Sequence, residues 1–391
     1  MRVVHVSDCY APRTGGIESQ VRDLATHQAA EGHAVHVLTA TAGADGGLRT
    51  TTTEPGGVRV HRMASALTFG IPVHPAGRRL VGRALGLLRP DVVHVHAGVL
   101  SPFAFDGARA ALAQGLPVAI TWHCMLTGVE APMRLAARLT SWRDAPAALS
   151  AVSGVAAARV AAALGRDDVA VVTNGLDVAQ WRPAGPPEAV LGADSEFGAD
   201  SVLRVVATQR LAPRKRSLPL LRAFARALDA LGADPAGRPR AHLSVVGAGP
   251  DERALRREVD RLGLADAVSL LGRVERGDLP AFYRGQQVFL SATVKEAFGL
   301  AGLEARAAGL AVVARAGTGI SEYVVDGVDG FLADDDDGLT ARLVELARDP
   351  GLRERILAHN RAVAPAADFA DVLAAAEREY ARAATLAGRE R

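Results

Sequence analysis

Short runs of β-branched and apolar residues alternate with helical segments along almost the whole of this chain. The alternation occurs twice, in two series separated by a stretch without periodicity. Such a pattern predicts two parallel β-sheets whose strands are joined by helices. The expected strands of the first series are Val3–Ser7, Ala34–Ala40, Val58–Met63, Asp91–His96, Pro117–Trp122, Leu149–Val152 and Val169–Thr173. Those of the second series are Leu203–Thr208, His242–Val246, Val268–Leu271, Val288–Ser291 and Ala311–Ala314.

The break between the two series is residues 182–201, a stretch rich in proline, glycine and acidic residues. This composition is typical of a linker, and 391 residues are too many for one hydrophobic core. We therefore expect an N-terminal domain over 1–181, a linker over 182–201 and a C-terminal domain over 202–365. Residues 366–391 should form a final helix, whose apolar stripe packs back on the body of the protein.

Charge and composition exclude several classes of protein. The formal net charge is only +2, which argues against nucleic acid as a partner. No apolar run approaches the roughly 20 residues that a membrane span needs, and the short apolar N-terminus is typical of a first strand. Cys9 and Cys124 form no zinc or disulfide pattern, so we expect a cytoplasmic protein.

Two turns stand out as sites for an anion. Gly15 and Gly16 follow the first expected strand and open a helix, where free N–H groups favour negative charge. The dinucleotide fingerprint is absent at this position, which argues against a plain NAD enzyme. After strand Leu203–Thr208 come four cations within seven residues, from Arg210 to Arg216, at a strand end where they could clamp a diphosphate.

Two further glycine turns give weaker signals. Gly247-Ala248-Gly249-Pro250 follows one strand and opens a helix, and Leu271-Gly272-Arg273-Val274 ends another. Either could present backbone groups to a nucleotide, although each is also an ordinary way to end a strand.

The strongest element is the sequence from Glu296 to Glu304, EAFGLAGLE. Eight helical residues turn through about 800°, so an ideal helix would leave the two carboxylates roughly 80° apart. They can serve one ligand if Glu296 lies on a loop and Glu304 lies two turns into the helix. The N–H groups of Phe298, Gly299 and Leu300 would then point at phosphate.

The order Gly-Gly turn, TWH, QRLAPRK, VGAGP, LGRV and EAFGLAGLE resembles the retaining glycosyltransferases of the GT-B fold, family GT4 (glycosyl transferases group 1). The resemblance covers essentially the whole chain, and the glutamate pair matches the E-x7-E motif of that family. It implies an α/β protein with two Rossmann-like domains facing across a deep cleft. The nucleotide-sugar donor would bind on the C-terminal side and an unknown acceptor on the N-terminal side.

The resemblance also implies a role for each matching residue. Arg210 and Lys215 would neutralise the diphosphate, Glu296 would hold the transferred sugar and Glu304 the ribose, and His123 would lie near the sugar. Gln209 departs from the family, in which glycine is common at that place. The implied catalytic residues are His123, Arg210, Lys215 and Glu296. The implied donor-binding residues are Gly15, Gly16, Gly249, Arg273, Val274, Phe298, Gly299, Leu300 and Glu304, with no metal and no cofactor.

Other interpretations stay open at this point. A sugar-nucleotide 2-epimerase of the same fold would bind the same donor, as would a non-catalytic sugar-nucleotide-binding protein. A phosphorylase would need a lysine for pyridoxal phosphate, and the chain has only Lys215 and Lys295. The segment Gly77–Arg89 interleaves arginines with leucines, which leaves peripheral contact with the inner membrane face, or a membrane adaptor, possible.

Two polar groups favour structural roles. The acidic run Asp334–Asp337 should cap a helix that begins near Gly338. His94 and His96 face the same side of a strand, and with no third ligand evident we expect packing rather than zinc binding.

Overall fold

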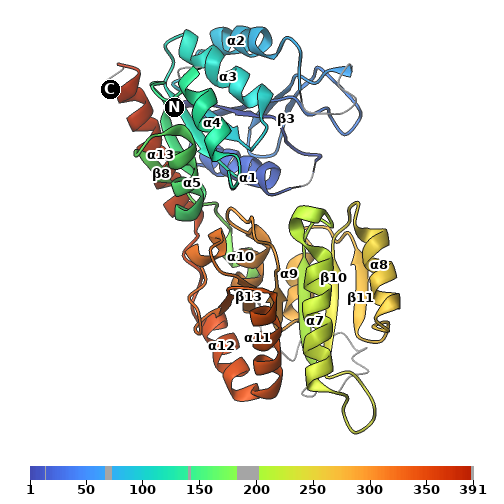
Figure 1. The fold of residues 1–391 in the computed structure, drawn as a ribbon. Helices are drawn as coiled ribbons and strands as arrows, with labels where there is room; N and C mark the ends of the chain where they lie inside the picture. Colours follow the sequence, from blue (N-terminus) through green and yellow to red (C-terminus); the bar gives the residue numbers. More distant parts are fainter. Residues whose placement is uncertain (14, 67–72, 140–141, 183–201, 389–391) are drawn as a thin grey trace. The chain divides into compact units, whose positions relative to one another are not determined.

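The computed structural model describes residues 1–13, 15–66, 73–139, 142–182 and 202–388. The chain divides into two compact units, Met1–Gly175 with Ala367–Arg391, and Leu176–Ala366. The first strand and the last helix therefore belong to the same unit (Figure 1).

The division falls a few residues before the segment that the sequence marks as a linker. Helix α6 (Val178–Trp181) belongs to the second unit, where the buried Trp181 ring lies 5.9 Å from that of Tyr283. A helix of four residues has no periodicity to reveal its partner, so the sequence alone placed it with the N-terminal domain. The expected linker, from residue 183 onward, lies outside the described residues.

The first unit is built on an eight-stranded sheet of order β3-β4-β2-β1-β5-β6-β7-β8, parallel except for the pairing of β3 with β4. Its strands are β1 Arg2–Ser7, β2 Ala34–Thr39, β3 Thr51–Thr53, β4 Arg59–Arg62, β5 Val92–Ala97, β6 Val118–Trp122, β7 Ala148–Ala151 and β8 Val169–Val171. Its helices are α1 Gly16–Ala30, α2 Gly77–Leu88, α3 Pro102–Ala113, α4 Glu130–Leu139, α5 Gly154–Leu164 and α13 Phe369–Leu386.

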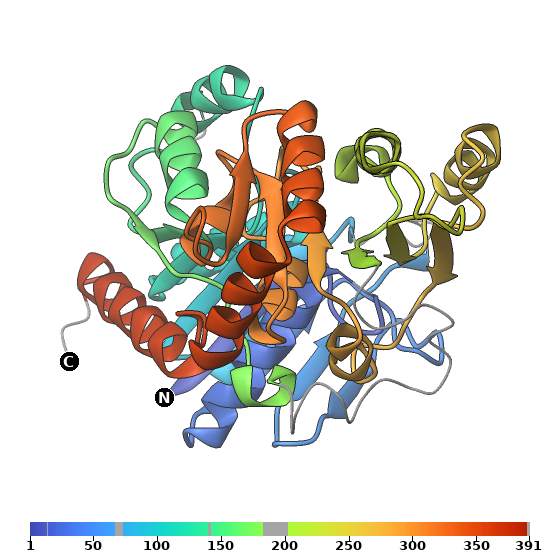
Figure 2. The ribbon, with the colours of Figure 1, turned by 90° about the horizontal axis from the view of Figure 1, so that it is seen from below.

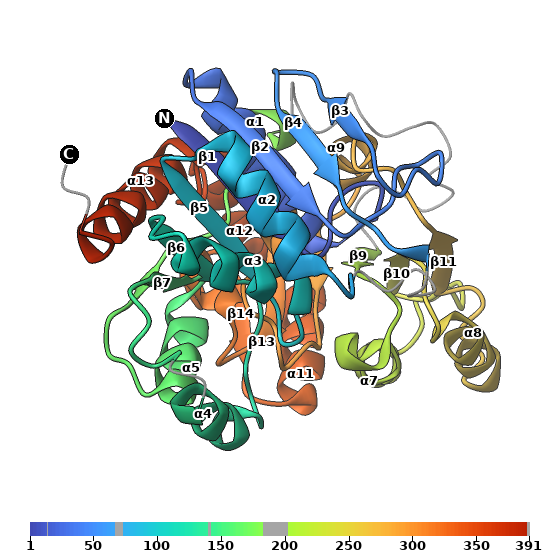
Figure 3. The same cartoon turned by 90° about the horizontal axis from the view of Figure 1, so that it is seen from above.

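Alternate residues of β1 meet different layers of helices. Val6 faces α3, where a Cβ on Gly107 would lie only 2.6 Å from its Cγ1. Val3 faces the opposite way and shares a buried cluster with residues of α13. Figure 3 shows α2 and α3 side by side over the strands. Because both faces are covered, every residue of the strand after Arg2 is buried, including the polar His5 and Ser7.

The C-terminal helix α13 packs back on the first unit, as the sequence predicts. Asp368 caps it by accepting a hydrogen bond of 3.2 Å from the Ala370 N–H. One stripe of α13 is buried, and through it the helix packs against α1 and against the sheet at β5, β6 and β7. The buried residues of this stripe are Phe369, Val372, Ala376, Glu379, Tyr380 and Ala383.

The second unit is built on a six-stranded parallel sheet of order β11-β10-β9-β12-β13-β14, flanked by helices (Figure 2). Its strands are β9 Leu203–Thr208, β10 Ala241–Val246, β11 Val268–Gly272, β12 Val288–Leu290, β13 Ala311–Arg315 and β14 Gly330–Ala333. Besides α6, its helices are α7 Ser217–Leu231, α8 Glu252–Arg261, α9 Leu279–Arg284, α10 Leu300–Ala307, α11 Asp336–Arg348 and α12 Pro350–Ala362. The α/β class and the two Rossmann-like units are confirmed.

Two strands have no counterpart in the sequence prediction. The edge strand β3 is three exposed threonines and has no apolar face. β14 is a short GFLA run without β-branched residues, held by parallel pairing to β13. Among the described residues, no helix is both long and apolar enough to cross a bilayer.

Candidate functional site

The sheet of the second unit reverses its strand order between β9 and β12, with β10 on one side and β13 on the other. Ligands of open α/β sheets bind beyond the carboxyl ends of the strands at such a switch point. The basic turn follows β9 and the glutamate motif follows β12. The fold therefore brings the two strongest sequence motifs to adjacent positions.

The cations of the basic turn differ in their surroundings. Lys215 ends a 3-10 turn (Pro213–Lys215), and its ammonium forms an ion pair with the carboxylate of Glu296. Both side chains are largely buried. Arg210 and Arg214 are exposed, and neither side chain makes a hydrogen bond or ion pair within the part of the chain that the structure describes. Lys215 is thus fixed beside Glu296, whereas Arg210 is free to meet a ligand.

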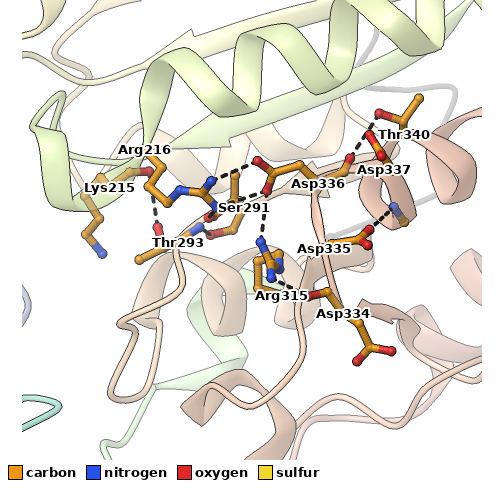
Figure 4. Close-up of polar contacts among 12 residues, drawn as sticks. Lys215, Arg216, Ser291, Thr293, Arg315, Asp334, Asp335, Asp336, Asp337 and Thr340 are labelled. Carbon is orange, nitrogen blue, oxygen red and sulfur yellow. Dashed lines mark hydrogen bonds and ion pairs between the residues drawn. The ribbon is translucent and has the colours of Figure 1, made fainter. Parts of the chain in front are cut away.

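Arg216 is tied to the protein itself. Its guanidinium donates two hydrogen bonds to the carboxylate of Asp336, of 2.9 and 2.8 Å, and a third of 3.1 Å to the Ala292 carbonyl (Figure 4). Asp336 also accepts a hydrogen bond of 2.9 Å from Arg315. Arg216 has a left-handed backbone with φ 55°, which is unusual for a residue with a Cβ. This cation therefore anchors the turn to α11 and to the segment that directly follows β12.

The acidic run at the start of α11 caps the helix, as the sequence predicts. Asp335 accepts a hydrogen bond of 2.7 Å from the Gly338 N–H, so the helix begins at Asp336 (Figure 4). Asp335 thus caps the helix and Asp336 pairs with two arginines, so both carboxylates have partners within the protein.

The glutamate motif forms a tight loop before α10. Gly299 precedes the helix with φ 86°, and its carbonyl accepts a hydrogen bond of 2.6 Å from the Tyr323 hydroxyl. The Gly319 N–H donates to the Glu296 carbonyl at 2.9 Å, and a Cβ on Gly319 would overlap the Ala297 carbonyl. The loop is therefore held rigidly against the turn that follows β13.

Glu296 lies on the loop and Glu304 lies within α10, as the motif requires. Glu304 is 7% exposed and accepts a hydrogen bond of 3.2 Å from Arg276. Phe298 is buried, so only its backbone can reach a ligand, whereas Gly299 and Leu300 are partly exposed at the start of the helix. The first N–H groups of an α-helix have no partner within the helix, and they favour an anion.

The three turns after β9, β10 and β11 are hydrogen-bonded to one another. The Leu211 N–H donates to the Ala248 carbonyl at 3.0 Å, and the Gly247 N–H donates to the Gly272 carbonyl at 2.7 Å. Gly249 has φ 158°, and a Cβ there would collide with the Leu211 carbonyl. The predicted donor-binding turns thus share one edge of the sheet. Beyond Gly272, Arg273 is exposed and pairs with Glu275 at 3.3 Å, and Val274 is half-buried.

In the first unit, the predicted residues lie at the carboxyl ends of β1 and β6. Gly15 precedes α1 and Gly16 begins it, and both are exposed. His123 directly follows β6, where its Nε2 lies 3.0 Å from Nδ1 of His96. Burial lowers the pKa of His123 to about 4, an effect that Asn174 partly offsets. The ring is therefore neutral at pH 7.

Sequence reasoning missed one member of the histidine cluster. His5 on β1 lies beside His94 and His96, and one nitrogen of each ring is within 4.8 Å of the others. This is the third residue that a metal site would require. However, both nitrogens of every ring are hydrogen-bonded to protein groups. His5 could not be predicted as a member of this cluster, because His96, the ring to which it is hydrogen-bonded, lies 91 residues further along the sequence.

A nucleotide-sugar glycosyltransferase is expected to have the features described so far: two Rossmann-like units, a lysine–glutamate pair at a switch point and a second glutamate within a helix. Comparison with known families agrees. The family description "Glycosyl transferases group 1" matches residues 199–362, and "Glycosyltransferase Family 4" matches residues 14–180. The chain belongs to the GT4 glycosyltransferases of GT-B fold, and it is an enzyme of the transferase class.

Two curated relatives match over nearly their whole length. The chain is 30% identical to the D-inositol 3-phosphate glycosyltransferase of Actinosynnema mirum, covering 90% of this chain and 89% of that protein. It is 28% identical to the GDP-mannose-dependent alpha-(1-6)-phosphatidylinositol monomannoside mannosyltransferase of Mycobacterium tuberculosis, covering 93% and 91%. A match to the Frankia alni D-inositol 3-phosphate glycosyltransferase, at 35% identity, covers 52% of this chain and half of that protein.

A solved structure supports the fold. The chain is similar to Anabaena Alr3699/HepE in complex with UDP and glucose, with a TM-score of 0.73 and 20% identity, covering 97% of this chain and 98% of that one.

Proposed function

We propose that this protein is a retaining hexosyltransferase that moves a sugar from a UDP- or GDP-sugar to an acceptor hydroxyl. The observation that carries the proposal is the Lys215–Glu296 pair at the switch point of the second sheet. It places a fixed cation beside a carboxylate, which is what a diphosphate leaving group and a polyhydroxylated sugar require.

Arg210 and Lys215 stabilise the departing diphosphate in this proposal. The negative charge on the leaving group grows in the transition state, so cations held in place lower the barrier most. Because these side chains supply the positive charge, we propose that transfer needs no metal ion, and that activity survives a chelator.

Glu296 and Glu304 hold different parts of the donor. Glu304 is nearly buried and already accepts a bond from Arg276, which suits a carboxylate that binds the two hydroxyls of ribose. Glu296 is more accessible and receives hydroxyls of the transferred sugar. The backbone of residues 298–300 and the turns at Gly249, Arg273 and Val274 complete donor binding.

The first unit serves the sugar and the acceptor. Gly15 and Gly16 leave room for a substrate at the start of α1, and His123 contacts a sugar hydroxyl. The acceptor attacks from the face that the leaving group vacates, and a phosphate oxygen of the donor takes its proton. Retention then needs neither an enzymatic nucleophile nor a dedicated base.

The relatives suggest where to search for substrates. Their names mention GDP-mannose and acceptors built on inositol, and the Anabaena protein binds UDP. We propose an acceptor in glycolipid, cell-envelope or natural-product biosynthesis. A thermal-shift screen of UDP, GDP, ADP and TDP selects the base, because a nucleotide at 100 times its Kd stabilises the protein by about 2.7 kcal/mol.

Mass spectrometry after incubation with labelled donors and inositol-type acceptors then tests the reaction. A transferred sugar of unchanged anomeric configuration is the expected product. An epimerised donor would favour a 2-epimerase, and tight binding without any product would favour a sugar-nucleotide-binding protein.

A further inference from the structure

Four histidines of the first unit form a hydrogen-bonded chain across its sheet. His5, His94 and His96 are at most 2% exposed. His5 Nδ1 lies 2.9 Å from His96 Nε2, and His96 Nδ1 lies 3.0 Å from His123 Nε2. The chain therefore begins in the core and ends at His123, at the carboxyl edge of the sheet.

The other end of this chain is anchored on helices α1 and α13. His5 Nε2 lies 2.7 Å from the Gln28 amide oxygen, and the Gln28 amide nitrogen donates to the Tyr380 hydroxyl at 2.7 Å. Tyr380 in turn lies 2.9 Å from His94 Nδ1. Each neutral ring and each hydroxyl has a single proton to donate, so a group that donates to one neighbour must accept from the next.

A backbone carbonyl fixes that direction. The Ser150 hydroxyl donates to the Ile120 carbonyl at 3.4 Å, and a carbonyl can only accept. Ser150 must then accept from Thr121, which lies 2.8 Å away, and Thr121 must accept from His94 Nε2, 2.7 Å away. His94 Nδ1 is consequently an acceptor, and the Tyr380 hydroxyl donates to it.

The remaining bonds follow step by step. Tyr380 accepts from the Gln28 amide, which leaves the Gln28 oxygen to accept from His5 Nε2–H. A neutral imidazole has one donor and one acceptor, so His5 Nδ1 accepts from His96 Nε2–H, and His96 Nδ1 accepts from His123 Nε2–H. Burial holds the pKa of each of these rings below its ordinary value, which keeps them neutral.

The outermost nitrogen of this hydrogen-bonded network is Nδ1 of His123. His123 Nδ1 is buried and makes no hydrogen bond of normal geometry with any residue that the structure describes, although Asn174 lies beside the ring. The direction of the hydrogen bonds in the network leaves Nδ1 of His123 without a proton, so this nitrogen can only accept a hydrogen bond. A buried acceptor without a donor is costly in a folded protein, and a ligand is one explanation for it.

We propose that the network from Ile120 through Tyr380, Gln28, His5 and His96 fixes His123 as its Nε2–H tautomer, so that Nδ1 accepts a hydrogen bond from a hydroxyl of the bound sugar. The tautomer rests on the network alone, whereas the hydroxyl rests on the proposed function. Such a site selects a hydrogen-bond donor and disfavours a carboxylate or phosphate oxygen. Tyr380 and Gln28 are positioning residues, because they act through other side chains.

Nitrogen NMR of the wild-type protein, labelled with 15N-histidine, tests the network directly. We expect His5, His94, His96 and His123 all to carry their proton on Nε2 at pH 7. A His123 ring protonated on Nδ1, on both nitrogens, or on either nitrogen in exchange would overturn the proposal.

Tyr380→Phe removes one hydroxyl and keeps the shape of the ring. We expect mixed tautomers at His123 and a loss of about tenfold in kcat/KM, which corresponds to one weakened hydrogen bond. Ser153→Ala is the matched control, because Ser153 is equally buried in the first unit but caps α5 outside the network. A variant Tyr380→Phe that retains the pure Nε2–H tautomer of His123 would refute the positioning role.

The ligand is tested with UDP, GDP, UDP-glucose and GDP-mannose, in parallel thermal shifts and NMR spectra. We expect the sugar nucleotide that binds to move the Nδ1 resonance of His123, and its nucleoside diphosphate to leave that resonance unmoved. A sugar nucleotide that raises the melting temperature without moving Nδ1 would remove the hydroxyl contact. If none of the four compounds binds, the proposed function fails, while the wild-type tautomers still decide the network.

Discussion

Lys215 and Glu296 pair with each other, although in the proposed reaction they hold different parts of one donor. The lysine comes from the turn after β9 and the glutamate from the loop after β12. A phosphate that binds Lys215 competes with the Glu296 carboxylate for the same ammonium. Donor binding and the orientation of Glu296 are therefore coupled, which makes the two residues informative to change.

Lys215→Met and Arg210→Ala should each reduce turnover on the order of 10²-fold or more while the fold survives, since each removes a cation from the leaving group. Arg214→Ala is the matched control, because Arg214 lies between them, is exposed, and has no assigned role. Steady-state kinetics and thermal melting of the three variants provide the comparison. Near-normal turnover in both Lys215→Met and Arg210→Ala would remove the diphosphate role.

The two glutamates should fail in different ways. Glu304→Ala should raise KM more than it lowers kcat, because ribose changes little during the reaction. Glu296→Gln should lower kcat more than it raises KM, because the sugar gains positive charge in the transition state. With the parent enzyme, a 2′-deoxyribose donor should have a much higher KM than the normal donor. With Glu304→Ala the difference in KM between the two donors should be much smaller. Equal losses with the deoxy donor in both enzymes would show that the roles are misassigned.

Arg216 should matter for stability more than for donor binding. Arg216→Ala breaks two charge-assisted bonds to Asp336, and we expect it to lower the free energy of unfolding by about 1–3 kcal/mol. A double-mutant cycle with Asp336→Ala, followed by denaturant melts, measures the coupling. A melt unchanged by Arg216→Ala, together with a large loss of nucleotide affinity, would instead make Arg216 part of the clamp.

Acid should destabilise the first unit between about pH 6.5 and 4. Burial lowers the pKa of His5 and of His36 to about 4, and that of His96 well below its ordinary value. The unfolded chain then binds more protons than the native one, so stability falls as pH falls. Burial raises the pKa of Asp8 to about 6, so this carboxyl favours the native state as pH falls. Because one carboxyl opposes three histidines, we expect the net effect of acid to be a loss of stability. Melting temperatures that stay level or rise between pH 6.5 and 4.5 would contradict this.

Liposome co-sedimentation should show no salt-sensitive preference for anionic lipid. Arg78, Arg79 and Arg83 are exposed on α2, as is Leu87, which is 85% exposed. In a chain whose basic residues are almost all arginine, such a helix needs no lipid to explain it. Strong binding that is lost in an Arg78→Gln/Arg83→Gln variant would instead point to a lipid acceptor.

Local sequence patterns were enough to predict most of the fold and the positions of the site motifs. Strands and helices of this class have periodic apolar faces, so both sheets, α13 and the turns around Lys215 and Glu296 could be read along the chain. Features that depend on distant partners could not. His5 meets His96 across 91 positions, and Gln28 meets Tyr380 across 352.

The basic turn shows the same limit at close range. Arg214, Lys215 and Arg216 are three consecutive cations, and the sequence alone gives no reason to assign them different partners. Only the partner distinguishes them: Asp336 holds Arg216, Glu296 holds Lys215, and Arg214 extends into solvent. Asp336 lies 120 residues further on, and its position beside the turn depends on the packing of α11 against α7.

The placement of α13 has a consequence for how the protein is made. Val3, Val92, Ala119 and Ala148 share a buried cluster with residues 376–383, which the ribosome synthesises only after the whole second unit. The second unit is encoded as an uninterrupted insertion, so it is complete before the first unit has its last helix. We expect a released chain truncated after residue 366 to hold a folded second unit and an open first sheet. The first unit, although its first strand is made before any part of the second, would then become resistant to protease after it.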